Sequence, residues 1–275
     1  MSAVRDTSSG AAIQHRYELA RKLAREAGAI GMDMFRRREQ LEIEQKGVQD
    51  MVSIADRAIE DYIRGHIARE FPHDGVLGEE RGGGDGESSH LWVIDPIDGT
   101  ACFVNGMHSW CVSIGILVDG EPIIGVVYDP NADELFHACK GHGAWANGTR
   151  LQVKQARSLR DGVLGVGFSH RVKTPTFIPF LKRVLEDGGM FIRNGSGALM
   201  IAYVAAGRLI GYFEPHINSW DCLAGVVLVT EAGGVANPFF ENDGLMKGNP
   251  ILVAGDELYR QLEQISLPYC TPAET

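Results

Sequence analysis

The chain has 275 residues, of which 44% are hydrophobic, and a formal net charge of −10. This length and apolar content are sufficient for a buried core in one large domain or in two joined lobes, and they indicate a globular protein. The negative charge removes the usual electrostatic drive toward nucleic acid or an anionic membrane surface, so we expect neither as a partner.

The five cysteines are odd in number and show no C-x-x-C spacing. This usage argues against a disulfide framework or a zinc site and fits a reducing compartment. No apolar run approaches 18 residues, and the first ten residues lack the basic and then apolar layout of a signal peptide. We therefore expect a soluble, cytoplasmic protein.

Residues 1–10 are small and polar, and we expect them to be disordered. From residue 13 onward, apolar and small residues recur at alternating intervals of three and four, which predicts one face of a helix ending near residue 37. Alternation over residues 41–45 predicts a short strand. A serine at position 53 is a suitable N-cap for a further helix that ends near residue 71.

Residues 75–77 predict a strand that ends at Gly78-Glu79-Glu80. The glycine-rich segment 81–87 follows. It lacks the Gly-Lys-Ser/Thr ending of a phosphate-binding loop, and no helical pattern begins after it. We favour a plain flexible connection here, with a flap that folds over a ligand as the alternative.

The apolar residues 91–94 predict a buried strand that runs into the hexapeptide Asp95-Pro96-Ile97-Asp98-Gly99-Thr100. Because Pro96 stiffens the turn, two carboxylates and the Ile97 carbonyl can converge. Three hard oxygens that repel one another favour a bound Mg²⁺, Mn²⁺ or Ca²⁺ over zinc. The stretch therefore predicts a metal site.

The end of the same hexapeptide favours a bound anion. Gly99 allows close backbone approach, and Thr100 is a good N-cap for the next segment, so two free N–H groups can face a phosphate. The alternative for an Asp-Gly-Thr stretch alone is an ordinary turn with capping residues.

Two hairpins are predicted in the first half of the chain. Strands at residues 111–117 and 123–128 flank Asp119-Gly120, and Asn147-Gly148 follows a strand at residues 135–139. These strands predict an antiparallel-sheet, metal-binding lobe of about residues 11–153.

The second half alternates strands, turns and helices, which predicts an α/β lobe of about residues 154–275. The expected strands are 163–168, 191–193, 209–213 and 251–254, and the expected helices are 174–184, 198–206, 222–229 and 257–265. Residues 11–275 would thus form a single domain of two lobes, of the α+β or α/β class.

Three motifs in this order resemble the inositol monophosphatase family of Mg²⁺-dependent, lithium-sensitive phosphatases. They are Gly78-Glu79-Glu80, the hexapeptide 95–100, and Trp220-Asp221 followed by Ala224-Gly225. The similarity extends from about Lys46 to about Gly255. It implies a layered α-β-α-β-α sandwich of the sugar-phosphatase type and a homodimer.

The resemblance also implies the site. Glu79, Asp95 and the Ile97 carbonyl would hold one Mg²⁺, and Asp95, Asp98 and Asp221 another, with two or three ions in all. The implied catalytic residues are Glu79, Asp98, Thr100 and Asp56, of which Asp56 lies near Thr100 and steadies the site of a metal-activated water. The residues implied at the substrate are Gly99, Thr100, Gly195, Ser196, Gly197, Glu214 and Asp221.

For some of these positions the residues themselves allow a plainer interpretation. The turn 195–197 could be any glycine turn between a strand and a helix, and Glu214 could be a surface residue at a strand end. An aspartate in the first turn of a helix, such as Asp221, is normally a capping residue.

The expected function is hydrolysis of myo-inositol monophosphate to inositol and phosphate. Histidinol phosphate is the alternative substrate, and fructose-1,6-bisphosphate and nucleotide bisphosphates are less favoured. A hypothesis of another class is a regulatory binding protein whose phosphatase activity is secondary or absent.

Overall fold

The computed structural model describes residues 3–40, 43–47, 50–84 and 86–266. Its larger sheet has eight strands in the order β10-β9-β8-β7-β6-β5-β3-β4. Their bounds are β3 (Gly75–Gly78), β4 (Gly82–Gly83), β5 (His90–Asp98), β6 (Cys111–Val118), β7 (Glu121–Asp129), β8 (Glu134–Cys139), β9 (Ala144–Ala146) and β10 (Thr149–Arg150).

We expected an antiparallel sheet, but this sheet is mixed, because β3 and β5 run parallel. After β3 the chain forms the edge strand β4, which is antiparallel to β3, and then returns to β5 on the other side. The glycine-rich segment after Glu80 is therefore not a plain flexible connection throughout, since residues 82–83 pair with β3.

The two predicted hairpin turns are confirmed. Asp119 and Gly120 connect β6 to β7 with φ angles of 52° and 80°. Asn147 and Gly148 connect β9 to β10 with φ angles of 46° and 83°. Positive φ at both central residues is the requirement of a type I′ turn, which these residue types tolerate.

The smaller sheet has five strands in the order β12-β11-β13-β15-β14. Strand β11 lies parallel to both β12 and β13, whereas β15 lies antiparallel to β13 and β14. The bounds are β11 (Val163–Val166), β12 (Met190–Ile192), β13 (Gly211–Ile217), β14 (Val235–Ala236) and β15 (Asn249–Ala254).

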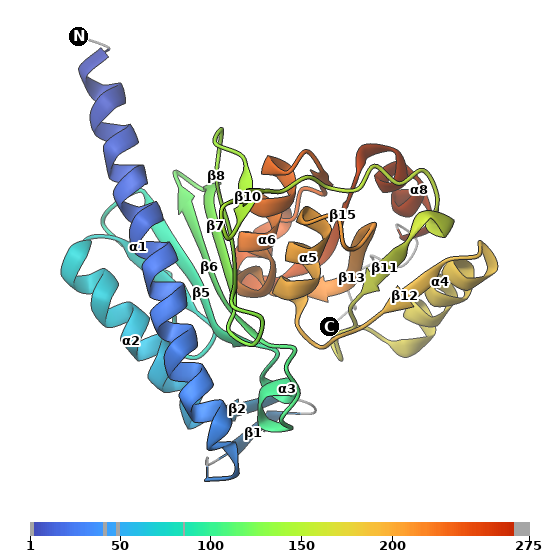
Figure 1. Ribbon diagram of the computed structural model, residues 1–275, viewed down its shortest axis with the longest axis horizontal. Helices are drawn as coiled ribbons and strands as arrows, with labels where there is room; N and C mark the ends of the chain where they lie inside the picture. Colours follow the sequence, from blue (N-terminus) through green and yellow to red (C-terminus); the bar gives the residue numbers. More distant parts are fainter. Residues whose placement is uncertain (1–2, 41–42, 48–49, 85, 267–275) are drawn as a thin grey trace.

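Helices and sheets form the expected α-β-α-β-α layers (Figure 1). Helices α1 (Ala3–Arg36) and α2 (Ile54–Glu70) cover the outer face of the larger sheet. Helices α5 (Gly197–Ala205) and α6 (Ser219–Glu231) lie between the sheets, and α4 (Thr174–Glu186) and α8 (Asp256–Ser266) cover the smaller sheet. The remaining elements are the β1 (Ile43–Gly47) and β2 (Asp50–Ser53) hairpin, α3 (Thr100–Val104), α7 (Gly244–Lys247), and the short 3-10 helices η1 (Arg38–Gln40), η2 (Leu159–Asp161) and η3 (Glu241–Asp243).

Helix α1 begins earlier than expected. The apolar face predicted from residue 13 onward packs on the sheet and includes the fully buried Ala20, Ala24 and Ala27. The helix extends back to Ala3, so residues 3–10 are helical and not disordered. No proline or glycine interrupts residues 3–9, and a packed helix can propagate into such a segment one hydrogen bond at a time.

Helix α6 is the central element of the molecule. Residues 222–229 are all buried, because the helix lies between the two sheets and is apolar on every side. Its approach to the larger sheet requires glycine at two positions. A Cβ on Gly115 would lie 2.0 Å from the Leu223 side chain, and a Cβ on Gly125 would lie 2.2 Å from the Ala224 carbonyl oxygen.

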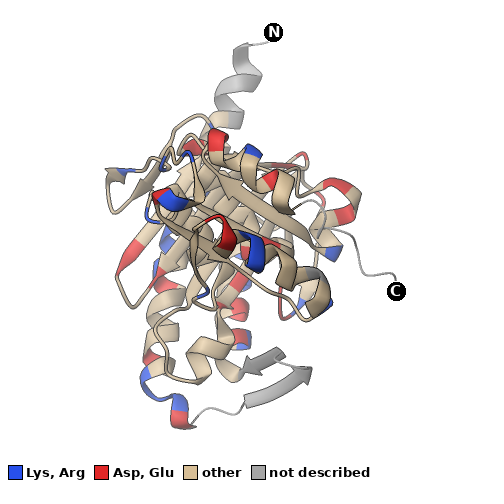
Figure 2. Cartoon of the chain, turned by 90° about the vertical axis from the view of Figure 1, so that its right-hand side faces the viewer, with Lys and Arg blue, Asp and Glu red and all other residues tan. Residues whose placement is uncertain are grey.

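In the described ranges, no helix combines the length and the apolar character needed to cross a lipid bilayer. On the side of the molecule shown in Figure 2, acidic and basic positions of the described residues are intermixed over the helices and loops. The net negative charge is therefore not gathered into one acidic block on this side.

Candidate active site

Three aspartates from distant segments meet where β5 ends. Asp95 and Asp98 lie at the C-terminal end of that strand, and Asp221 lies in the first turn of α6. One carboxylate oxygen of each lies within 4.8 Å of the others. Asp95 is 1% and Asp98 is 7% exposed. Such a buried set of oxygen donors is suited to a hard divalent cation.

Glu79 joins this cluster through the parallel pairing of two strands. Gly78 on β3 is in register with Ile94 on β5, so the next residues, Glu79 and Asp95, leave the same edge of the sheet together. The Glu79 amide donates to the Ile94 carbonyl at 3.2 Å, and the Glu79 and Asp95 side chains are hydrogen-bonded to each other. The four predicted carboxylate ligands are therefore brought together.

The electrostatics of the cluster fit a bound cation. Burial, together with repulsion between the carboxylates, raises the pKa of Glu79, Asp95 and Asp221 well above the usual range. Burial raises the pKa of Asp98 to about 6, and hydrogen-bond donors limit the rise. All four groups can be ionised together near neutral pH only when positive charge compensates them, and all-oxygen donors favour Mg²⁺ or Mn²⁺.

Asp98 is held by the N-terminal end of α5. It accepts hydrogen bonds from the Ala198 amide at 2.7 Å, from the Gly197 amide at 3.3 Å, and from the Ser196 hydroxyl. The Ser196 hydroxyl also accepts from the Leu199 amide and so caps α5. Ser196 and Gly197, which the resemblance places at the substrate, thus also orient a carboxylate of the cluster. The Ala198 contact was not predicted, although helix N-termini attract anions.

Thr100 and Asp56 are in contact, as expected. The Thr100 hydroxyl lies 3.1 Å from an Asp56 carboxylate oxygen and 3.0 Å from the Ile97 carbonyl oxygen. Asp56 is fully buried in the first turn of α2. The expected N-cap is wrong by one position, because Gly99 caps α3 and Thr100 is its first residue. Gly99 has a φ of 96°, and a Cβ there would lie 2.6 Å from the Ser109 carbonyl oxygen, so only glycine fits.

Asp221 is the capping residue considered for this position and is also a member of the aspartate cluster. One of its carboxylate oxygens accepts from the Asn218 amide at 3.2 Å, which caps α6, while the side chain also belongs to the aspartate cluster. Both roles are compatible because the N-terminal end of a helix favours negative charge.

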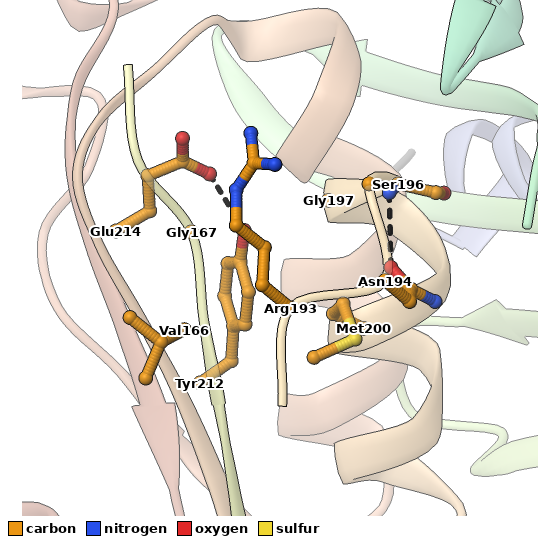
Figure 3. A pocket seen from close by; sticks show the side chains of 10 residues that line it. Val166, Gly167, Arg193, Asn194, Ser196, Gly197, Met200, Tyr212 and Glu214 are labelled. Carbon is orange, nitrogen blue, oxygen red and sulfur yellow. Dashed lines mark hydrogen bonds between the residues drawn. The ribbon is translucent and has the colours of Figure 1, made fainter. Parts of the chain in front are cut away.

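A pocket adjoins the cluster, between β13 and the turn before α5 (Figure 3). Glu214 and Tyr212 point into it from the same face of β13, and the Tyr212 hydroxyl donates to Glu214 at 2.6 Å. The Arg193 side chain lies beside them, and the predicted residues Gly195, Ser196 and Gly197 line the opposite wall. Arg193 and Tyr212 were not predicted. Tyr212 could have been found from its spacing, because it lies two residues before Glu214 on the same strand and therefore on the same face.

Burial raises the pKa of Glu214 to about 7, although Tyr212 and Arg193 favour its ionised form. A carboxyl group whose pKa is raised by folding does not change the free energy of unfolding at low pH, where it is protonated in both states. It destabilises the folded protein as the pH rises from the pKa of the unfolded state to the pKa of the folded state. Without metal, we expect Glu214→Gln to raise the free energy of unfolding by about 3 kcal/mol at pH 8 and by less than about 1 kcal/mol at pH 5. Urea denaturation in EDTA at both pH values measures this.

The control is Glu257→Gln, since the Glu257 side chain is 67% exposed and pairs only loosely with Arg157. This variant should show no such dependence on pH. If Glu214→Gln raised the free energy of unfolding equally at both pH values, this result would contradict the raised pKa of Glu214.

The layered fold and the carboxylate cluster define the class: an α+β sandwich with a set of oxygen donors suited to a divalent cation, beside a pocket. Residues 12–266 match the sequence profile of the inositol monophosphatase family. The chain belongs to this family.

Two curated relatives and one solved structure illustrate the similarity. The chain is 36% identical to Nus factor SuhB of Haemophilus influenzae over 89% of this chain and 92% of the relative. It is also 36% identical to an inositol-1-monophosphatase of Mesorhizobium japonicum, over 90% of this chain and 91% of that relative. The crystal structure of extragenic suppressor protein suhB from Bartonella henselae superposes with a TM-score of 0.84 at 32% identity, over 90% of this chain and 96% of that one.

Proposed function

We propose that this protein is a Mg²⁺-dependent phosphomonoesterase whose preferred substrate is myo-inositol monophosphate. The observation that supports this most strongly is the cluster of Asp95, Asp98 and Asp221, to which Glu79 is hydrogen-bonded, beside a pocket that carries an acceptor, Glu214. A family relative named inositol-1-monophosphatase supports the same substrate.

Two sets of residues would hold the ions. Glu79, Asp95 and the Ile97 carbonyl would hold one Mg²⁺, and Asp95, Asp98 and Asp221 would hold another, with two or three ions in all. When bound, Mg²⁺ supplies charge neutralisation for the phosphate and the leaving alkoxide and makes a nearby water more acidic.

The remaining steps belong to the side chains and amides. The Thr100 hydroxyl donates a hydrogen bond to Asp56, which leaves the hydroxyl oxygen free to accept from the attacking water. Glu79 takes the proton that this water loses, and the leaving alkoxide takes a proton from solvent water. The amides of Gly99 and Thr100 hold phosphate oxygens. Phosphoryl transfer depends mainly on positioning and charge neutralisation, so no protein nucleophile is needed.

The alcohol part of the substrate would occupy the pocket of Figure 3. Glu214 would accept hydrogen bonds from ring hydroxyls, and the turn formed by Gly195, Ser196 and Gly197 would lie against the ring. Gly167 keeps this wall open, since a Cβ there would lie 2.2 Å from a Glu214 carboxylate oxygen.

The test is phosphate release with Mg²⁺, with and without EDTA, from four esters: myo-inositol-1-phosphate, L-histidinol phosphate, fructose-1,6-bisphosphate and adenosine 3′,5′-bisphosphate. We expect the inositol ester to be preferred in kcat/KM by about a hundredfold, or about 2.7 kcal/mol of transition-state discrimination. EDTA should abolish activity on all four. A preference for histidinol phosphate would leave the metal site intact and overturn the assignment of the pocket.

The second candidate is a regulatory binding protein with secondary phosphatase activity. It is favoured by one finding, that a relative of the same identity is named Nus factor SuhB. A pull-down with the Asp98→Asn protein that recovers one stoichiometric macromolecular partner would support it. Such a partner, together with wild-type turnover too slow to measure on all four esters, would replace the enzyme proposal.

We further propose a homodimer through the face formed by α4 and the edge strand β12. This face gathers exposed apolar side chains, namely Ile178, Leu185, Met190, Phe191 and Ile192. Exposed apolar patches of this kind mark interaction sites. We expect Met190→Asp, at a side chain 65% exposed, to convert a dimer into a monomer without unfolding it.

Light scattering coupled to size-exclusion chromatography measures the mass in solution. The control is Met246→Asp on α7, where the methionine is 53% exposed outside this face. It should leave the dimer intact. A wild-type protein that elutes with the mass of a monomer would contradict the proposal.

Two further features of the proposal concern the conditions of activity. We place the protein in the cytoplasm, in agreement with the four described cysteines, which are free and buried. We also expect Li⁺ to inhibit turnover. A titration of LiCl against matched KCl at saturating Mg²⁺ tests this property.

A further inference from the structure

A buried ion pair on α2 is not used by the mechanism above. The Glu60 side chain is 0% and the Arg64 side chain 24% exposed, and the Arg64 Nε lies 2.7 Å from a Glu60 carboxylate oxygen. The two residues are one helical turn apart and point toward the loop between β3 and β4. A buried carboxylate is costly unless it is paired and hydrogen-bonded, so its partners are informative.

The partners of Glu60 are the peptide groups that follow Glu79. One carboxylate oxygen accepts from the Glu80 amide at 2.8 Å, and the other accepts from the Arg81 amide at 3.2 Å. On the other side of Glu79, a Cβ on Gly78 would lie 2.2 Å from the Glu60 carboxylate. The carboxylate of Glu60 therefore touches the backbone before Glu79 and binds the backbone after it.

Arg64 fastens the two strands that flank this loop. Its Nη1 donates to the Val76 carbonyl on β3 at 3.3 Å, and its Nη2 donates to the Gly82 carbonyl on β4 at 2.5 Å. Because one planar guanidinium bonds to Glu60 and to both strands, it restricts their relative movement. Glu79 lies between these two anchored strands.

The same helix also holds the other half of the water-activating pair. Asp56, which binds the Thr100 hydroxyl, precedes Glu60 by four residues, so both carboxylates lie on one face of α2. The relative positions of Thr100 and Glu79 are thus set by a single rigid element. Charge-assisted hydrogen bonds of this kind are roughly twice as strong as neutral ones.

We propose that Glu60, braced by Arg64, is a positioning residue that fixes the Glu79 carboxylate in the metal centre. It thereby sets the affinity for the cation that Glu79 holds and the rate of the reaction. This inference rests on the proposed function, because Glu79 is assigned as a metal ligand there.

The experiment uses the full-length protein with Glu60→Gln. This substitution keeps the shape of the side chain but replaces one acceptor oxygen by an NH₂ group, which cannot accept a hydrogen bond from a backbone amide. A second variant, Arg64→Lys, keeps a positive charge but cannot reach both strand carbonyls and the carboxylate. Mn²⁺ binding is measured by calorimetry without substrate, and kcat is measured at saturating Mg²⁺, both per folded protein from circular dichroism. We expect about tenfold weaker Mn²⁺ binding and a loss in kcat of tenfold or more.

Asp74 provides a matched control at the opposite end of β3. Its buried carboxylate accepts from Arg16, from the Trp92 indole at 2.9 Å and from the Ser88 hydroxyl at 2.7 Å, and none of these groups belongs to the site. Asp74→Asn should lower the melting temperature at least as much as Glu60→Gln does, and leave Mn²⁺ affinity and kcat unchanged.

The outcomes separate the two proposals. If Glu60→Gln does not fold, Arg64→Lys decides by the same two measurements. Wild-type values for Mn²⁺ affinity and kcat in the folded variants, or an equal loss in Asp74→Asn, would overturn the positioning role. A wild-type protein that binds Mn²⁺ but hydrolyses none of the four esters would instead overturn the proposed function, while weaker Mn²⁺ binding by Glu60→Gln would still support this inference.

Discussion

An Asp98→Asn variant is expected to lose on the order of 10³-fold in kcat while remaining folded, because it removes the charge of a proposed cation ligand, whose contribution would be electrostatic. Folding should survive, since the asparagine oxygen can still accept from the Ala198 amide as the carboxylate does. Turnover of myo-inositol-1-phosphate and circular dichroism of the same sample measure the two parts of this result.

The stability of the variant should change in a way that depends on metal. In EDTA, Asp98→Asn removes one of four mutually repelling carboxylates, so its melting temperature should exceed that of the wild type. With Mg²⁺ the order should reverse, because ligand binding stabilises the wild type more.

Asp256→Asn is the control for both measurements. Its side chain is 62% exposed and pairs with Arg260 on the surface of α8, so substitution should leave kcat and the Mg²⁺-induced shift unchanged. Near-normal turnover by Asp98→Asn would remove this aspartate from the metal centre.

The second large effect concerns the buried pair Thr100 and Asp56. Thr100→Val keeps the volume of the side chain but removes its hydroxyl, and Asp56→Asn weakens the acceptor that orients it. Each variant is expected to lose about 10²-fold in kcat, a typical contribution of positioned proton transfer. The double variant should lose little more than either single one, because the two residues act as a unit.

Steady-state kinetics on the four proteins of this double-mutant cycle give the coupling. Thr100→Ser is the matched control, since it restores the hydroxyl and should recover most of the activity. Losses that multiply in the double variant would show that the two residues act independently and would contradict the proposed orientation of the water.

Local features of this fold could be predicted from the sequence because they depend on neighbouring residues. The turns at Asp119-Gly120 and Asn147-Gly148 follow from residue types that tolerate positive φ. The family resemblance implied that Asp56 contacts Thr100 and that Glu79 lies beside Asp95. The structure shows both contacts.

Features that depend on topology could not be predicted in the same way. The parallel pairing of β3 with β5 results from the detour through β4, which a glycine-rich segment does not reveal. The contact between Ala198 and Asp98 joins residues one hundred positions apart. The role of Glu60 could not be predicted from the sequence, because periodicity indicates which face of a helix is apolar and not which loop a buried carboxylate contacts.

The middle layer of the fold has a consequence for assembly. The site takes Glu79, Asp95 and Asp98 from the larger sheet, but Asp221 from α6 and Glu214 from the smaller sheet. The lobe 11–153 contains all the proposed ligands of the first ion, whereas the set proposed for the second ion is completed by Asp221 from the lobe 154–275. A chain divided between the two lobes is therefore expected to be inactive as separate fragments and to bind the second ion only after the fragments reassociate. Occupancy of this second position would report that the two halves have joined correctly.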